Sequence, residues 1–227
     1  MTIKENLLRI KNEIPDDVEI VLAAKTRVKE EIEEAISAGA KVIGQNYVQE
    51  AEEMFESLGE MAKKLKWHMI GSLQKNKINK ALKIFDCFQA VDSFELAEAI
   101  NKRAKRIDKK VAIFIEINIG SEFTKSGVKP EYETIKKLAQ DISKLKNLKV
   151  EGLMTMGPRT GNPEKIRPYF KKTKEFFDKL KEANIAGINL RYLSMGMSNS
   201  YKIAIEEGAN MVRLGTVLFG ERDYGNI

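Results

Sequence analysis

Short apolar, β-branched runs alternate with longer amphipathic runs along the whole chain of 227 residues. The short runs are apolar at most of their positions, which is typical of strands covered on both faces of a parallel sheet. They predict eight strands, at residues 19–26, 41–46, 67–71, 87–92, 111–119, 150–156, 190–195 and 211–219. Each predicted strand is followed by a segment with helical periodicity.

The helical segments carry start and stop signals. Ser93 precedes the run "FELAEAI", Pro130 and Pro163 lie near helix starts, and Gly39 and Gly208 follow helix ends. The predicted helices span residues 3–13, 29–38, 47–65, 75–83, 93–107, 130–144, 163–183 and 198–207. Eight βα units favour a closed (β/α)8 TIM barrel, of the α/β class, over an open doubly wound sheet. With no linker or low-complexity segment, we expect one domain over residues 1–227.

The number and distribution of charged residues do not alter the predicted fold. The 39 basic residues are balanced by 33 acidic ones, and both kinds are interleaved along helices such as "KEEIEEAISAGAK". This pattern is typical of solvated helix faces. No basic run is interleaved with aromatic residues, so we expect no nucleic acid partner. No apolar run reaches membrane-spanning length and the N-terminus lacks an apolar signal core, so we expect a cytoplasmic protein without a membrane partner.

Cysteine and histidine are too scarce for a disulfide or a common metal site. The chain has one of each, and zinc sites need several such ligands. Cys87 lies in the apolar run "IFDCFQAV" and is expected to be a packed thiol. His68, in "KWHMIGSLQKNK", is interpreted as a hydrogen-bonded core residue, with a catalytic role as the alternative.

In a (β/α)8 barrel the chemistry lies where strands end and the following loops begin. Lys25 ends the apolar run "VLAAKT". If its side chain enters the barrel mouth, partial burial favours the neutral amine that Schiff-base chemistry needs. The alternative is a lysine that extends to solvent. The candidates at predicted strand ends are Lys25, Asn46, Ser72, Asp92, Asn118, Ser194 and Thr216.

Two segments near the C-terminus suggest a phosphate site. "SMGMSNS", residues 194–200, and "GTVLFG", residues 215–220, follow the last two predicted strands. Glycines and hydroxyls at a helix start present backbone N–H groups, and barrels of this kind often bind phosphate there. Closure pairs strand eight with strand one, so a phosphate held by Ser194, Ser198, Gly215 and Thr216 would lie beside Lys25. An amine next to a phosphate site suggests pyridoxal 5′-phosphate (PLP).

Each of these segments has a simpler interpretation. "SMGMSNS" can be a helix cap with methionines as core filler, and "GT" a bend where two backbones approach. Arg213 lies two residues before Gly215 and, by strand alternation, faces the same side. Inside the barrel its guanidinium needs an acceptor, either a pyridine nitrogen or an acidic neighbour. At a pyridine nitrogen it would leave that atom unprotonated and weaken the ring as an electron sink.

A series of motifs runs in order along nearly the whole chain: "AAKTR", "GQNYVQEA", "WHMIGSLQKNK", "AVDSFELAEAI", "INIGSEFTKSG", "EGLMTMGP", "LSMGMS" and "ANMVRLGTVLFGER". Together these motifs resemble the pyridoxal phosphate homeostasis protein family. The resemblance implies an alanine-racemase-like barrel without that enzyme's second domain. It also implies a Schiff base between PLP and Lys25, Arg213 at the ring nitrogen, and a cofactor site completed by Asn46, Met154, Ser194, Ser198, Gly215 and Thr216.

The function implied by the resemblance is PLP homeostasis: the protein stores the cofactor and hands it to PLP-dependent acceptor enzymes, as a monomer without established catalytic turnover. The alternatives are a PLP-dependent amino-acid racemase or decarboxylase, and a Schiff-base aldolase acting on sugar phosphates. Two positions depart from the family pattern, with Gln45 in place of Glu and Ser200 in place of Asp. Losing both carboxylates changes helix capping or the charge around the cofactor.

Overall fold

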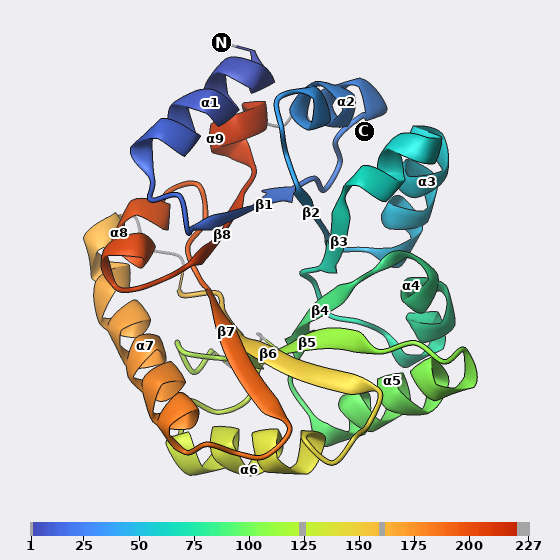
Figure 1. Ribbon diagram of the computed structural model, residues 1–227. Helices are drawn as coiled ribbons and strands as arrows, with labels where there is room; N and C mark the ends of the chain where they lie inside the picture. The colour runs from blue at the N-terminus through green and yellow to red at the C-terminus, as the bar shows by residue number, and fades with distance from the viewer. Residues whose placement is uncertain (1, 123–125, 159–161, 222–227) are drawn as a thin grey trace.

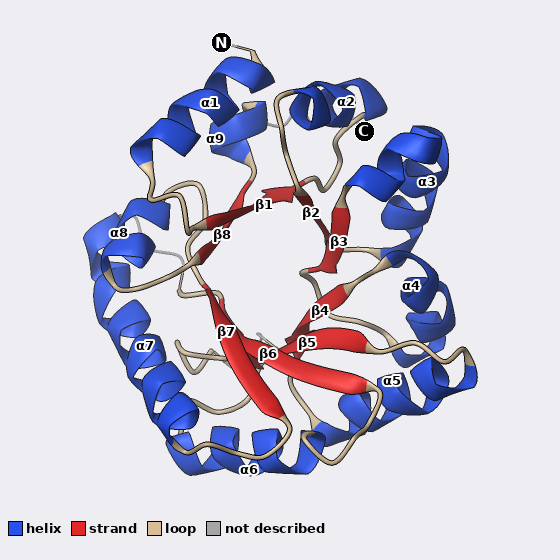
Figure 2. Ribbon diagram, in the orientation of Figure 1, coloured by secondary structure: helices blue, strands red, loops and turns tan. Residues whose placement is uncertain are grey.

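The computed structural model describes residues 2–122, 126–158 and 162–221. Eight parallel strands close into a barrel in chain order, and helices surround it (Figures 1 and 2). This confirms the predicted TIM barrel. The strands are β1 Glu19–Ala23, β2 Val42–Gln45, β3 Lys66–Met69, β4 Cys87–Val91, β5 Val111–Ile117, β6 Leu148–Thr155, β7 Ile188–Ser194 and β8 Met211–Leu214.

The helices follow the predicted alternation, with caps that their sequences supply. Thr2 and Glu5 form a capping box at the first helix, and Ser93 Oγ accepts the backbone N–H of Leu96 at the fifth. The α-helices are α1 Ile3–Glu13, α2 Lys29–Ser37, α3 Val48–Leu58, α4 Ile78–Ile84, α5 Phe94–Arg106, α6 Tyr132–Ile142, α7 Arg167–Glu182, α8 Tyr201–Glu206 and α9 Thr216–Phe219. Within the described ranges, the 3₁₀ helices are η1 Gly59–Lys64, η2 Lys75–Lys77 and η3 Pro163–Ile166.

The predicted end of strand eight is wrong. The strand stops at Leu214, and residues 216–219 form the short helix α9 instead. Short apolar runs of this kind do not reveal by periodicity whether they are strand or helix. Here the run packs against α1, and Asn6 Nδ2 donates to Leu218 O at 2.9 Å. Thr216 is therefore the first residue of a helix rather than a strand residue.

Three other predicted boundaries shift for local reasons. Strand β1 ends at Ala23, so Lys25 lies in a turn just beyond it. The helix predicted over 47–65 divides at Gly59, whose φ of +55° takes the backbone into the left-handed region. The helix predicted from residue 198 begins only at Tyr201, because residues 198–200 form a turn.

Buried side chains form two separate cores. The outer layer, between the strands and the helices, is apolar and contains most of the buried aromatic rings. The lumen of the barrel has a smaller apolar cluster of Val21, Val42, Ile70, Cys87, Ala90, Phe114, Met154 and Met211. Cys87 is 2% exposed, which confirms the packed thiol, and burial raises the pKa of that thiol well above its usual range. None of the helices in the described ranges is long and apolar enough to cross a membrane.

Candidate functional site

Lys25 lies at the C-terminal mouth of the barrel, in the turn that follows β1. The backbone N–H of Arg27 donates to Ala24 O at 3.1 Å and closes the turn, and Thr26 adopts a φ of +62°. The Lys25 side chain is half-buried, and its Nζ lies 5.0 Å from the centroid of the Tyr47 ring. An ammonium above an aromatic face gains a modest cation–π attraction, which holds the amine at the mouth.

Arg27 joins this turn to the last helix. Its Nη1 donates to Phe219 O at 3.3 Å and its Nη2 to Gly220 O at 2.7 Å, while the guanidinium also lies over the Phe219 ring, 5.1 Å from its centroid. These bonds satisfy carbonyls at the end of α9 that the helix itself leaves unpaired. Analysis of the sequence missed this role, although Arg27 is part of the quoted "AAKTR" motif. The turn that carries Lys25 is thereby held against α9.

Three of the four predicted phosphate residues meet where α9 begins. Ser198 Oγ accepts the backbone N–H groups of Gly215 at 3.1 Å and Val217 at 3.3 Å. Gly215 lies alongside β1, because a Cβ added there would be 3.4 Å from Ala23 O. Thr216, between these two donors, is exposed. The start of α9 therefore binds a hydroxyl oxygen beside the end of the strand that precedes Lys25.

The fourth predicted phosphate residue, Ser194, is fully buried in the lumen. Its Oγ donates to Gln89 Oε1 at 2.7 Å and accepts a hydrogen bond from Arg213 Nη1 at 2.6 Å. Both of these partners are protein side chains. Its contact with a phosphate stays a prediction.

Arg213 reaches the lumen from β8 and is 3% exposed. Its Nη1 donates to Ser194 O at 3.0 Å as well as to the Ser194 hydroxyl, and its Nη2 donates to Thr155 O at 2.8 Å. Burial lowers the pKa of Arg213 to about 10, an effect that the negative charge of Glu116 opposes. Backbone and hydroxyl oxygens, rather than an ion pair, are thus the hydrogen-bond acceptors of Arg213 among the described residues.

Glu116 brings a carboxyl group into the same part of the barrel. It is 3% exposed, and its Oε2 has no hydrogen-bond partner in the part of the chain that the structure describes. Its pKa is raised to about 7, mainly by burial and also by nearby Asp92, and the positive charge of Arg213 opposes this shift. Nothing in the sequence marked Glu116 beyond its place as a lone acidic residue in the apolar run "AIFIEINI".

The other predicted residues flank this region. Met154 is fully buried, and its β6 position pairs with Glu116 on β5 and Ser194 on β7. Asn46 is half-buried just after β2, where Gly71 approaches so closely that a Cβ would meet Asn46 O at 2.6 Å. His68 is 6% exposed, with Nδ1 2.8 Å from Gln89 Nε2. This burial and this contact confirm the predicted hydrogen-bonded core histidine, and burial lowers its pKa to about 3.

The two departures from the family pattern have different surroundings. Gln45 Nε2 donates weakly to Ala24 O at 3.4 Å, and its buried Oε1 has no partner among the described residues. Ser200 precedes α8, and its Oγ accepts the backbone N–H of Met197 at 3.2 Å. Ser200 therefore stabilises the turn before α8 without a carboxylate.

The loops after β3, β4 and β5 meet at the same mouth. Ser72 Oγ and Ser126 Oγ lie 2.8 Å apart, and Asp92 Oδ2 accepts the backbone N–H of Gly127 at 3.4 Å. Asn118 Nδ2 donates to Glu122 O at 2.8 Å. Part of the motif "INIGSEFTKSG", residues 123–125, lies outside the described residues.

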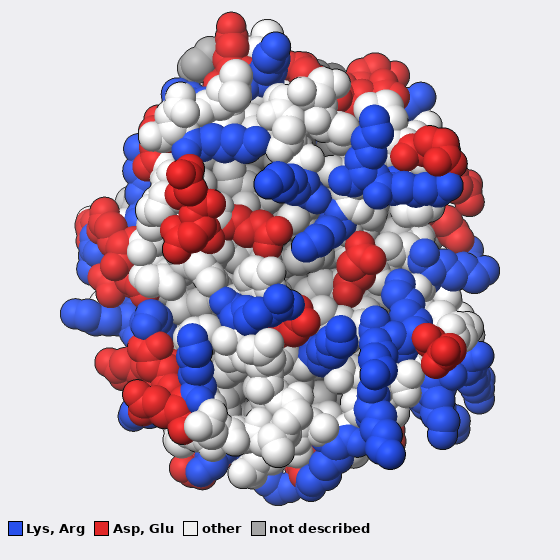
Figure 3. All heavy atoms as spheres, viewed as in Figure 1, with Lys and Arg blue, Asp and Glu red and all other residues white. Residues whose placement is uncertain are grey.

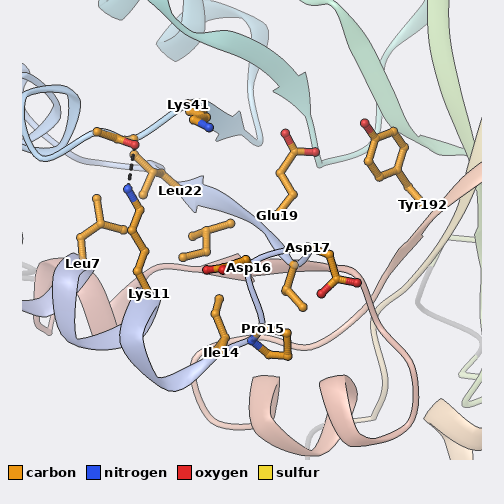
Figure 4. A pocket seen from close by; sticks show the side chains of 14 residues that line it. Leu7, Lys11, Ile14, Pro15, Asp16, Asp17, Glu19, Leu22, Lys41 and Tyr192 are labelled. Carbon is orange, nitrogen blue, oxygen red and sulfur yellow. Dashed lines mark hydrogen bonds between the residues drawn. The ribbon is translucent and has the colours of Figure 1, made fainter.

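A pocket of about 500 Å³ lies at the opposite end of the barrel, where α1 and the starts of β1 and β2 meet (Figure 4). Glu19, Asp16 and Asp17 face it together with Lys11 and Lys41. Lys11 Nζ is already bonded to Gly39 O at 2.9 Å. Mixed charges of this kind continue over the face seen in Figure 3, where basic and acidic side chains are interspersed. The Lys25 amine and the N–H donors of Gly215 and Val217 lie at the C-terminal mouth of the barrel, away from this pocket.

Comparison with known proteins decides the family. The alanine racemase N-terminal domain family matches residues 1–223. The pyridoxal phosphate homeostasis protein of Aquifex aeolicus is 45% identical over 203 residues, 89% of this chain and 86% of that protein. The chain belongs to the pyridoxal phosphate homeostasis protein family. The family member of Escherichia coli K12 is 33% identical over 92% of this chain and 88% of its own length.

Solved structures agree with this family assignment. PipY of Synechococcus elongatus, solved with PLP bound, has a TM-score of 0.88 and 30% identity, covering 96% of this chain and all of PipY. An alanine racemase from Clostridium difficile matches at a TM-score of 0.82 and 22% identity, and covers all of this chain but 58% of the racemase. With 22% identity over 58% of the racemase, this match shows the barrel fold alone, whereas the match with PipY includes the whole of that protein.

Proposed function

We propose that this protein binds PLP at the C-terminal mouth of its barrel, attached covalently to Lys25, and regulates the supply of the cofactor without a turnover of its own. One observation carries the proposal: Arg27 holds the turn of Lys25 against α9, and the N–H groups at the start of α9 already bind a hydroxyl oxygen. An amine and an oxygen-binding site thus lie on adjoining segments of one face.

The residues at the mouth fit PLP. The contact of Ser198 Oγ with the N–H groups of Gly215 and Val217 indicates that an oxygen of a phosphate can be accepted there. Arg213 uses three N–H donors on protein oxygens, which leaves two of its five for the acceptor nitrogen of a pyridine ring. The aldehyde of PLP condenses with an amine and releases water, and the Lys25 amine is the group that we assign to this attachment.

The same residues support storage rather than catalysis. A guanidinium gives hydrogen bonds but retains its protons, so Arg213 leaves a ring nitrogen unprotonated and the ring a weak electron sink. The relatives from Aquifex aeolicus and Escherichia coli are both called pyridoxal phosphate homeostasis proteins. We infer that the partners are PLP and the enzymes that receive it, and that a monomer is sufficient for binding.

The proposal is tested by trapping the adduct. Purified protein with added PLP should show an absorption band of the bound cofactor, and borohydride reduction followed by peptide mass mapping should place the label on Lys25. Lys25→Ala should lose the label entirely while keeping its circular dichroism spectrum. Lys75→Ala, which removes another lysine after β3, should retain it. A label that persists in Lys25→Ala, or that spreads over surface lysines, would overturn the assignment.

Racemase activity is the alternative, because the barrel is shared with alanine racemase. We expect purified protein loaded with PLP to leave D- and L-alanine without measurable interconversion. A turnover that disappears in Lys25→Ala would establish the enzymatic alternative instead.

A further inference from the structure

Four buried polar side chains form a continuous hydrogen-bonded relay across the lumen. His68 Nδ1 lies 2.8 Å from Gln89 Nε2, Gln89 Oε1 lies 2.7 Å from Ser194 Oγ, and Ser194 Oγ lies 2.6 Å from Arg213 Nη1. The four residues come from β3, β4, β7 and β8, and none is more than 6% exposed. They lie among apolar lumen residues such as Val21.

The relay has one direction. A guanidinium can only donate, so Ser194 Oγ accepts from Arg213 and its own O–H is directed to the carbonyl oxygen of Gln89. The Gln89 amide nitrogen is then left to donate to His68 Nδ1, so the ring carries its proton on Nε2 and stays neutral. The burial that lowers the pKa of His68 agrees with this neutral form.

A relay of this kind has a cost that apolar residues would avoid. Burying a polar group costs free energy unless its hydrogen bonds with water are replaced by hydrogen bonds within the protein. A protein with apolar side chains of similar volume in place of buried charged groups is often equally stable. The relay ends on the two hydrogen atoms of Arg213 Nη1, which go to the Ser194 hydroxyl and to Ser194 O. With Thr155 O on Nη2, these bonds determine the plane of the guanidinium and the direction of its two remaining donors.

We propose that His68 and Gln89 are positioning residues for the cofactor: through Ser194 they fix the orientation in which the Arg213 guanidinium meets the pyridine nitrogen of bound PLP. The inference rests on the proposed function. It gives the single histidine of the chain a role that needs no contact with PLP. It also explains a glutamine in the otherwise apolar strand β4.

The first test needs no cofactor. Because His68 is the only histidine, nitrogen-15 NMR of the ligand-free protein reports on one imidazole ring. We expect a neutral ring protonated on Nε2 from pH 5 to pH 8. In Gln89→Glu a carboxylate faces Nδ1 in place of an N–H donor, so the pKa of His68 should rise above about 6. A wild-type ring protonated on Nδ1, or an unchanged pKa in Gln89→Glu, would overturn the direction of the relay.

The second test uses bound PLP. His68→Leu removes the acceptor at the end of the relay, whereas His68→Asn keeps an oxygen near the position of Nδ1. We expect His68→Leu to weaken PLP binding about tenfold, the equivalent of one buried hydrogen bond, and to shift the absorption maximum of the bound cofactor. His68→Asn should retain both properties of the wild type. Cys87→Ala is the control, because it truncates a lumen side chain outside the relay.

The outcomes separate the two proposals. If wild-type protein takes no label on Lys25, the proposed function fails, and the NMR experiment still decides the direction of the relay. If wild type binds PLP and His68→Leu matches it in affinity and absorption maximum, the positioning role is wrong while the function stands. If Gln89→Glu does not fold, the pair His68→Asn and His68→Leu decides by the same two measurements.

Discussion

The outer layer and the lumen of this barrel both contain buried side chains, but the two regions differ in chemistry. The outer layer contains large apolar side chains such as Trp67, Phe85 and Phe88, each at most 1% exposed. The lumen combines a small apolar cluster with buried polar side chains. Among the described residues these include His68, Gln89, Glu116, Ser194 and Arg213. Apolar burial stabilises a fold in proportion to the area removed from water, whereas each buried polar group must recover its lost hydration.

The difference indicates that outward-facing side chains of the strands stabilise the fold and that lumen-facing polar side chains form part of the candidate site. Alternate residues of one strand face the two cores, so Phe88 packs outward on β4 while its neighbour Gln89 enters the relay. Substitutions in the outer layer should therefore change stability without changing the cofactor. Substitutions of the buried polar side chains in the lumen should change the site, and some of them should even raise stability.

The largest effect is expected in the outer layer. Phe88→Ala removes a ring that is 1% exposed and should lower the free energy of unfolding by about 3–5 kcal/mol. Urea denaturation measures this loss, with Phe94→Ala, at a site 40% exposed, as the matched control. The absorption maximum of bound PLP should stay unchanged in Phe88→Ala. A shift of that maximum would contradict the separation of the two cores.

The opposite sign is expected for Glu116→Gln. The pKa of the Glu116 carboxyl rises from 4.5 to about 7 on folding, so between these values the folded state binds more protons than the unfolded state. Wild-type stability therefore falls as the pH rises from about 4.5 to 7, by up to about 3 kcal/mol. Glu116→Gln lacks this loss and should be the more stable protein at pH 8, with the difference vanishing near pH 4.

Denaturation at a series of pH values checks this expectation. Glu98→Gln, at an exposed position on α5, is the control and should follow the wild type throughout. An unchanged or lower stability of Glu116→Gln at pH 8 would mean that the ionised carboxylate gains more from Arg213 than burial removes.

The smallest effect is expected at the start of α9. Ser198→Ala removes the oxygen that accepts the N–H groups of Gly215 and Val217, which should cost about 1 kcal/mol in the ligand-free protein. Ser57→Ala is the matched control, because the Ser57 hydroxyl donates to Met54 O and Met54 Sδ within α3 and its loss should be close to neutral. Chemical denaturation of both variants measures the difference. Equal stability of the two would mean that water replaces Ser198 at these donors.

Much of the fold could be predicted because periodicity reports on burial. Apolar runs marked every strand, and counting the units was sufficient to place Lys25 beside the C-terminal residues. The boundary between β8 and α9 could not be predicted, because the short run "TVLF" is compatible with a strand or a helix. Its packing on α1 determines that it is helical. The relay depends on side chains from four strands, so no local pattern contains it. Its one local signal was Gln89, a polar residue in an apolar strand.

The bonds from Arg27 to Phe219 O and Gly220 O join residues that are 192 and 193 positions apart in the chain. During synthesis the first strand and Lys25 leave the ribosome long before β8 and α9 exist. The turn of Lys25 therefore lacks its contact with α9 until residues 213–220 emerge. The N–H groups of Gly215 and Val217 are likewise absent until then. If PLP binds at Lys25 as proposed, its capture is a late event that requires a chain whose barrel has closed.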